Sequence, residues 1–233
     1  MPELYGNDYT EYQVRERVGG VEQVGGVERM TLTEGTSTGV EAFRFRTGGG
    51  LDFTVLAGRG MDIGAASYRG CPLAWVSSTG PAHPAFFEKE GLGWLRTFHG
   101  GLMCTCGLTY AGAPATDGDE ELGLHGRISH LPAGHVSSGA DWRDGEYIMY
   151  AEGEMRETSV FGPNMFMKRT VTAMLGEPKL HVRDVVRNDG FEPQEHMILY
   201  HCNLGFPMMD ADTELVAPSG SVEDRVQHSL ETI

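Results

Sequence analysis

The sequence predicts an all-β fold in which two large antiparallel sheets pack face to face. Several segments alternate between apolar and polar residues with period two, as in KLHVRDVVRN, where Leu180, Val182 and Val186 share one face. Glycine provides 33 of the 233 residues, about twice its usual share of ~7%, which is typical of short strands joined by tight turns. No window has the spacing of a long amphipathic helix.

The first expected strands lie in the N-terminal third of the chain. The segment VEAFRFR (40–46) is one of them, and residues 51–77 read as three strands broken by glycine turns at 58–60 and 69–70. Residues 78–94 contain proline and glycine and few alternating pairs. A long irregular loop is therefore expected there.

Four further strands are expected in the second half of the chain. They are 145–157, 166–175, 179–188 and 196–206. No change of composition marks a linker, so we expect a single domain over residues 1–233. Residues 213–233 show no clear closing strand, so the sandwich is expected to be incomplete at its C-terminal end, with open sheet edges that would favour a homo-oligomer.

Composition and charge exclude several classes of protein. The formal net charge is −15 and there is no basic cluster, so neither a nucleic acid nor an anionic membrane is an expected partner. No stretch approaches the ~20 apolar residues of a membrane span, and the N-terminal segment lacks the apolar run of a signal peptide. We therefore expect a cytoplasmic protein in which the cysteines are reduced and buried. They are Cys71, Cys104, Cys106 and Cys202.

Two histidines are candidates for a binding site. His201 lies in ILYHCNLGFP, an otherwise apolar strand, where an imidazole needs either a buried partner or a cleft. His125 lies between glycines in GLHGR, which permit close approach of a ligand, although a plain polar turn explains the same pattern. Arg127 in this segment either contacts a ligand or pairs with Glu120 or Glu121.

Two arginines in glycine-rich segments are also candidates. Arg96 in GWLRTFHGG can clamp hydroxyl groups through its planar fork of donors, or pair with Glu88 or Glu90. Arg59 in GRGMDIG either contacts a ligand or forms a local salt bridge with Asp62 that orders the turn.

A metal site is the weaker interpretation of these residues. His99, Cys104 and Cys106 lie close together in the sequence, yet structural zinc usually takes four ligands with a wider cysteine spacing. We therefore expect no metal there. A cupin-like metal enzyme that uses His99, His125 and His201 is a further hypothesis.

Five motifs follow one another along the chain: GRGMDIG, YRGCPLAWVS, WLRTFHGGLMCTCGL, GLHGRISHLPA and LYHCNLGFP. In this order they resemble the aldose 1-epimerase-like branch of the galactose mutarotase superfamily, and more narrowly a poorly characterised bacterial subfamily of it. The resemblance implies a β-super-sandwich with a small-molecule carbohydrate bound in a cleft on one sheet. It also implies an isomerase of carbohydrate metabolism that needs no cofactor.

The resemblance further implies a mechanism. A histidine protonates the ring oxygen of the sugar, a carboxylate deprotonates the anomeric hydroxyl, and the opened ring closes from the other side with the anomeric centre inverted. By resemblance, His201 is the general acid and His125 binds the sugar, whereas His130 is expected outside the cleft. Arg96 matches the sugar-binding arginine of the family by its order in the chain alone. Arg59 and Arg127 belong to motifs typical of the narrower subfamily and are further candidates for sugar binding.

The chain departs from the family in one respect. The general-base glutamate of the family comes late, near a GxEP-like signature, and no such signature follows His201. The later glutamates Glu214, Glu223 and Glu231 do not lie in the expected pattern. Two functions are therefore expected as alternatives: an epimerase whose base is supplied differently, and a sugar-binding domain without catalysis.

Overall fold

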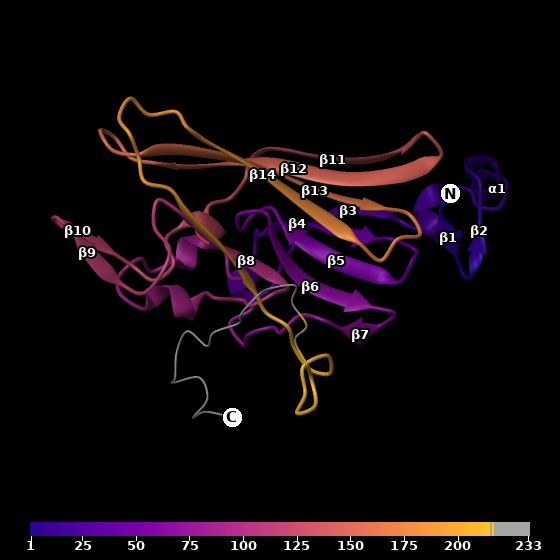
Figure 1. Ribbon diagram of the computed structural model, residues 1–233, viewed down its shortest axis with the longest axis horizontal. Coiled ribbons are helices and arrows are strands. Elements are labelled where there is room, and N and C mark those ends of the chain that lie inside the picture. Colours follow the sequence, from indigo (N-terminus) through magenta and orange to yellow (C-terminus); the bar gives the residue numbers. More distant parts are fainter. Residues whose placement is uncertain (215, 217–233) are drawn as a thin grey trace.

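The structure is a computed structural model that describes residues 1–214 and 216. Its main elements are a seven-stranded sheet and a four-stranded sheet, both antiparallel, with two short two-stranded ribbons beside them. Figure 1 shows the four-stranded sheet lying across one face of the larger sheet. Apolar side chains from both sheets form one core, so the predicted all-β sandwich is confirmed.

The larger sheet has the strand order β15-β8-β6-β5-β4-β3, with β7 paired to β6. Its strands are β3 (Gly26–Thr31), β4 (Glu41–Arg46), β5 (Leu51–Leu56), β6 (Asp62–Tyr68), β7 (Cys71–Pro72), β8 (Met103–Leu108) and β15 (Met197–Cys202). The smaller sheet is a meander of four consecutive strands. Its strands are β11 (Gly134–Arg143), β12 (Glu146–Thr158), β13 (Asn164–Met174) and β14 (Leu180–Asn188).

The remaining elements are short. The ribbons consist of β1 (Glu3–Leu4) with β2 (Asn7–Asp8), and β9 (Ala115–Asp117) with β10 (Glu120–Leu122). One helix, α1 (Glu11–Arg15), begins at a capping box. The 3-10 turns are Val21–Gln23, Gly35–Ser37, Pro84–Phe86, Gly93–Arg96 and Ile128–His130.

Most strands predicted from alternation are present. Residues 51–77 form β5, β6 and β7, broken at the predicted glycine turns, and the predicted loop 78–94 contains only 3-10 turns. The segment predicted as a strand over 196–206 ends earlier, at Cys202, because the backbone of Asn203 turns to bond Leu102 and Trp75. The long strand β11 was not predicted from the sequence.

Strict alternation explains how β12 fills the core. Every second residue from Tyr147 to Glu157 is buried, and the intervening residues are half-buried or exposed. On the larger sheet, Phe45 of β4 and Phe53 of β5 are cross-strand partners whose rings stack with centroids 4.7 Å apart. Both phenylalanines belong to the same apolar cluster as the buried side of β12.

The cysteines differ from the prediction. Cys104 and Cys106 of β8 are buried, as expected, but Cys71 and Cys202 are exposed. The latter two lie at the ends of strands, where the sheet does not cover them. Within the described residues, no helix has the length and apolar character needed to cross a bilayer.

A buried ionic network joins the two sheets. Arg169 of β13 makes a bidentate pair with Asp184 of β14, with Nε–Oδ1 2.7 Å and Nη2–Oδ2 2.6 Å. Its Nη1 donates to Thr105 Oγ1 of β8 (2.7 Å) and lies 3.4 Å from Asp62 Oδ1 of β6. Tyr200 of β15 donates its hydroxyl to Asp184 (2.8 Å). The network therefore fixes the position of β13 and β14 over three strands of the larger sheet.

Burial makes this network sensitive to the loss of one member. Burial raises the pKa of Asp62, and the Arg169 cation and the hydrogen bonds from Thr105 oppose that shift. Asp62 accepts both the backbone N–H of Thr105 (3.0 Å) and its hydroxyl (2.7 Å). A buried charge that loses its partner cannot recover its hydration, so each member depends on the others.

We predict that Arg169→Met lowers the free energy of unfolding by roughly 3–5 kcal/mol, because it leaves two buried carboxylates without their cation. Urea unfolding of the wild type and the variant measures this loss. The matched control is Lys168→Met, which removes a partly exposed ion pair with Glu152 and is expected to cost less than about 1 kcal/mol. Equal losses in the two variants would contradict a central role for Arg169.

Candidate functional site

His201 lies on the outer face of the larger sheet, away from the four-stranded sheet. It pairs with Cys104 in the β15–β8 register. Leu199, two residues earlier on β15, packs over the buried cysteines of β8, whereas Tyr200 points the other way and bonds Asp184. Because side chains alternate along a strand, His201 shares the outer face with Leu199.

His125 reaches the same region from a loop with an unusual backbone. His125 and Gly126 both have positive φ, 59° and 71°. The backbone of His125 is held at both ends, since its N–H donates to Gly112 O (2.9 Å) and its carbonyl accepts from Gly107 N–H (3.1 Å). A Cβ at position 126 would lie 2.3 Å from Tyr110 O and 2.6 Å from Gly107 O, so only glycine fits there.

The structure brings His125 and His201 together. Their ring centroids are 6.0 Å apart with an interplanar angle of 75°. The Trp94 ring lies 4.9 Å from His125, and the Phe98 ring lies 5.4 Å from His201. The Nδ1 atoms of both histidines are buried without a hydrogen-bond partner among the described residues. We call His125 and His201 the imidazole pair.

Burial sets the protonation state of one ring in the imidazole pair. Burial lowers the pKa of His125, and the neighbouring His201 adds to the shift. His125 is therefore neutral at neutral pH. A neutral imidazole offers one N–H donor and one acceptor nitrogen, which suits it to bind a hydroxyl group.

Arg59 lies in a buried cluster that orders the loops around the site. It is 0% exposed. Its Nε donates to Ser129 O (2.7 Å), Nη1 to Ala82 O (2.6 Å) and Nη2 to Thr97 O (3.1 Å). Nη2 also lies 3.0 Å from Nε2 of His130. The guanidinium thus joins three loop segments that are distant in the sequence.

The structure contradicts both sequence-based expectations for Arg59. Each of its three nitrogens already has a protein partner and the side chain is fully buried, so it does not face a ligand. The expected salt bridge with Asp62 is not formed. Asp62 pairs instead with Arg169, because its carboxylate points into the sandwich, where Thr105 and Arg169 lie.

His130 belongs to the same cluster. A guanidinium can only donate, so Nε2 of His130 accepts from Arg59, and the ring proton lies on Nδ1, 3.0 Å from Ser129 Oγ. Thr97 Oγ1 lies 2.8 Å from the same Nε2. We call Arg59, Thr97, Ser129 and His130 the Arg59 cluster.

The Arg59 cluster reaches the imidazole pair through Trp94. The indole Nε1 of Trp94 donates to Ser129 Oγ (3.3 Å), and the same indole ring contacts His125. Trp94 is 2% exposed and stacks on Phe98 with ring centroids 4.4 Å apart. Arg59 therefore acts on the site indirectly, by fixing the aromatic residues that border the two imidazoles.

Arg96 and Arg127 are both exposed. Arg96 donates from Nε to Glu88 Oε1 (2.9 Å), which is the alternative that the sequence left open. Over the described part of the chain, no ion pair joins Arg127 to Glu120 or Glu121. Neither arginine forms a hydrogen bond with the imidazole pair, so contact of either one with a ligand stays a prediction.

Several residues at the site were not predicted from the sequence. Trp94 and Phe98 could have been predicted, because they lie four residues apart in WLRTFHGG and this spacing allows two rings to stack across one turn. Glu157 of β12 carried no local signal. It is 8% exposed and accepts from Leu108 N–H (2.7 Å) and from Thr109 Oγ1 (2.6 Å). It therefore anchors the loop that holds His125.

The cupin-like metal arrangement is not formed. Over the described residues, no group of three or more His, Cys, Asp or Glu side chains could hold a metal ion. His99 lies apart from the imidazole pair and lines a pocket of the outer face that includes neither His125 nor His201.

Comparison with solved structures defines the class of fold. The chain is similar to a "putative aldose 1-epimerase" from Klebsiella pneumoniae subsp. pneumoniae MGH 78578, with 25% identity and a TM-score of 0.73 over 79% of this chain and 48% of that one. A galactose 1-epimerase from Lactobacillus acidophilus NCFM matches at 12% identity and a TM-score of 0.44, covering 71% of this chain and 49% of that one. The first of these similarities shows that this protein has an aldose 1-epimerase-like fold. The chain spans about half the length of both structures.

The family follows from the sequence match. Residues 37–233 match the family described as "Domain of unknown function (DUF4432)", and the chain belongs to that family. No curated protein matches the chain. The fold and the family together place the imidazole pair on an aldose 1-epimerase-like scaffold without assigning its activity.

We predict that Gly126→Ala disturbs the His125 loop and lowers the free energy of unfolding by more than about 2 kcal/mol, because strain at positive φ adds to a backbone clash. Urea unfolding measures the loss. The matched control is Gly118→Ala, whose φ of 58° is also positive but whose Cβ would meet nothing within 4 Å. The control is expected to lose only about 1 kcal/mol. Equal losses would show that the clash is relieved.

We also predict that stability falls in acid because of two buried histidines. Burial, followed by Arg59, lowers the pKa of His99 from 6.5 to about 3 and that of His130 to about 2. Below pH ~6.5 these histidines bind protons in the unfolded chain but stay neutral in the folded chain. Each histidine therefore lowers the free energy of unfolding by about 1.4 kcal/mol per pH unit, down to its folded pKa. Urea unfolding at several pH values between 6.5 and 4 measures the slope.

The variant that tests this pH dependence is His99→Phe, which is expected to reduce the slope by about 1.4 kcal/mol per pH unit. His181→Phe on β14 is the matched control and should keep the wild-type slope, because this side chain is exposed to solvent in the folded chain. An unchanged slope in His99→Phe would mean that His99 is protonated in the folded state.

Proposed function

We propose that the protein is a carbohydrate epimerase of the mutarotase type, which binds a monosaccharide at the imidazole pair. The observation that carries the proposal is the 6.0 Å approach of His125 and His201, which are 76 positions apart in the sequence (201 − 125). Nothing in local structure requires two polar rings with free nitrogens to meet among aromatic side chains. A ligand rich in hydroxyl groups offers hydrogen-bond partners to two such rings.

The chemistry assigns a role to each ring. His201 is the general acid that protonates the ring oxygen, because histidine is the side chain that most often serves as a general acid. His125, held neutral by burial, binds a sugar hydroxyl. Phe98 and Trp94 border the two rings and provide apolar surface for the C–H face of a sugar.

A second candidate function is sugar binding without turnover. Within the described residues, no carboxylate forms a hydrogen bond with either ring of the imidazole pair. Of the late glutamates, Glu214 is exposed, and Glu223 and Glu231 lie outside the described residues. Epimerisation needs a base to remove the anomeric proton, so the source of that base separates the two candidates.

The test is exchange between the α and β anomers of glucose and galactose, followed by one-dimensional NMR. The wild type is expected to accelerate the exchange above the buffer rate, and His201→Gln is expected to lose roughly 10²–10⁴-fold in rate, the usual contribution of a general acid. His181→Gln, an exposed histidine of β14, is the matched control and should retain the wild-type rate.

Calorimetric titration with the same sugars distinguishes the outcomes. Saturable binding that His125→Gln weakens, without any acceleration of exchange, would favour the sugar-binding function. Absence of both binding and exchange for every aldose tested would overturn the carbohydrate proposal.

A further inference from the structure

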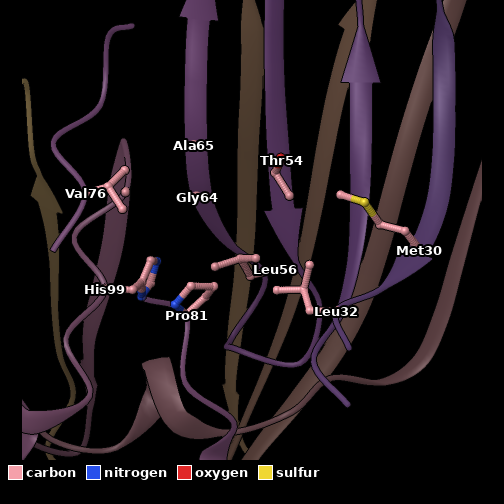
Figure 2. A pocket seen from close by; sticks show the side chains of 10 residues that line it. Met30, Leu32, Thr54, Leu56, Gly64, Ala65, Val76, Pro81 and His99 are labelled. Atoms are coloured by element: carbon pink, nitrogen blue, oxygen red, sulfur yellow. The ribbon is translucent and has the colours of Figure 1, made fainter. Parts of the chain in front are cut away.

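A pocket lies on the outer face of the larger sheet, beside the imidazole pair. It has a volume of about 170 Å³. Half of its lining residues come from β3, β5 and β6, and on β5 Thr54 and Leu56 alternate with the core residues Phe53 and Val55. The lining residues used below are Leu56, Ala65, Val76, Pro81, His99 and Gly101. Figure 2 shows His99 and Pro81 on one side and Leu56 next to them.

A short ladder of two segments separates this pocket from the imidazole pair. Residues 75–77 pair with residues 99–101, since Ser77 N–H donates to His99 O (3.0 Å) and Gly101 N–H to Trp75 O (2.9 Å). Trp75, like Phe98, belongs to the aromatic group beside the imidazole pair. Val76 follows Trp75 and His99 follows Phe98 in the sequence, and these two following residues line the pocket instead. The two sites are therefore neighbours with separate linings.

His99 is the unusual member of the lining. It is 3% exposed, and neither ring nitrogen has a hydrogen-bond partner among the described residues. Leaving such a buried polar group unpaired is costly, so native structures normally provide a partner. Burial lowers the pKa of His99 to about 3, so the ring is neutral with one donor and one acceptor.

Gly101 keeps the space beside the ring open. A Cβ at this position would lie 3.0 Å from Nε2 of His99 and 2.6 Å from Ile63 O. The φ of Gly101 is 79°, a conformation that glycine adopts readily. The absence of a side chain at position 101 therefore keeps a Cβ from crowding Nε2 of His99, in a mostly apolar pocket.

We propose that this pocket binds a small neutral molecule, or a neutral group of a larger one, with one ring or a short alkyl chain and a single hydroxyl group that pairs with His99. The apolar lining excludes charged ligands, because no charged side chain lines the pocket to compensate for their desolvation. The volume suits a single six-membered ring, since an apolar cavity of about 150 Å³ holds benzene. This proposal does not rest on the proposed carbohydrate function.

Phenol and toluene are the probes, because they share a ring and differ mainly in the hydroxyl group. Phenol is titrated into the 233-residue chain while the histidine ring nitrogens are followed by long-range ¹H–¹⁵N NMR, with the His99 signals identified by their loss in His99→Phe. We expect saturable shifts of the His99 ring nitrogens and a rise in the unfolding temperature, because the ligand binds the folded state. Toluene should bind more weakly.

Two variants test the site. Ala65→Phe, at an exposed position of the lining, should block phenol binding, whereas Ala115→Phe, at an exposed position of β9 outside the pocket, should leave it unchanged. His99→Phe removes the hydroxyl partner, so phenol should bind about tenfold more weakly while toluene binding changes little. If His99→Phe does not fold, the comparison of Ala65→Phe with Ala115→Phe still tests the proposal.

The contrary results are equally clear. Phenol that produces no saturable shift of His99, or binding that Ala65→Phe leaves intact, would overturn the proposal and indicate that His99 pairs only with ordered water. Equal affinity for phenol and toluene would refute the role of His99.

Discussion

The guanidinium of Arg169 holds the two sheets in their mutual position. It reaches from β13 to Asp184 on the neighbouring strand and across the sandwich to Asp62 and Thr105 on β6 and β8. Arg169, Asp62 and Asp184 are all almost inaccessible to water, so neither sheet can slide without separating buried charges. Because β8 also carries β15, and hence His201, the same interaction fixes the strand on which one half of the imidazole pair lies.

A second buried arginine orders the loops that complete the site. Arg59 has no carboxylate partner and is satisfied mainly by backbone carbonyls of three loop segments. Carbonyl acceptors have fixed directions, so the planar guanidinium specifies the mutual position of these loops. Ser129 accepts a hydrogen bond from the Trp94 indole, and the Trp94 ring contacts His125, so these two residues connect the ordered loops to His125. One arginine therefore positions sheets and the other positions loops.

The outer face of the larger sheet carries both candidate sites. The imidazole pair lies over β8 and β15, and the His99 pocket lies over β3, β5 and β6. The opposite face is occupied by the core shared with the four-stranded sheet. In the ladder of residues 75–77 and 99–101, Trp75 contacts Phe98, which borders His201, whereas Val76 and His99 line the pocket. A change in either segment therefore reaches both sites.

The sequence by itself determined most of the strands and their buried faces, because period-two alternation and glycine turns act over a few residues, and it singled out the two histidines as candidates. Alternation also placed Leu180, Val182 and Val186 on one face, where all three pack against the core. The tertiary structure alone decided which partners the arginines take. Arg59 and Asp62 are three positions apart and were expected to pair, yet Arg59 bonds Ser129, 70 positions away, and Asp62 meets Arg169, 107 positions away. A local pattern specifies which way a side chain points, whereas its partner depends on what the folded sheets and loops bring to that point.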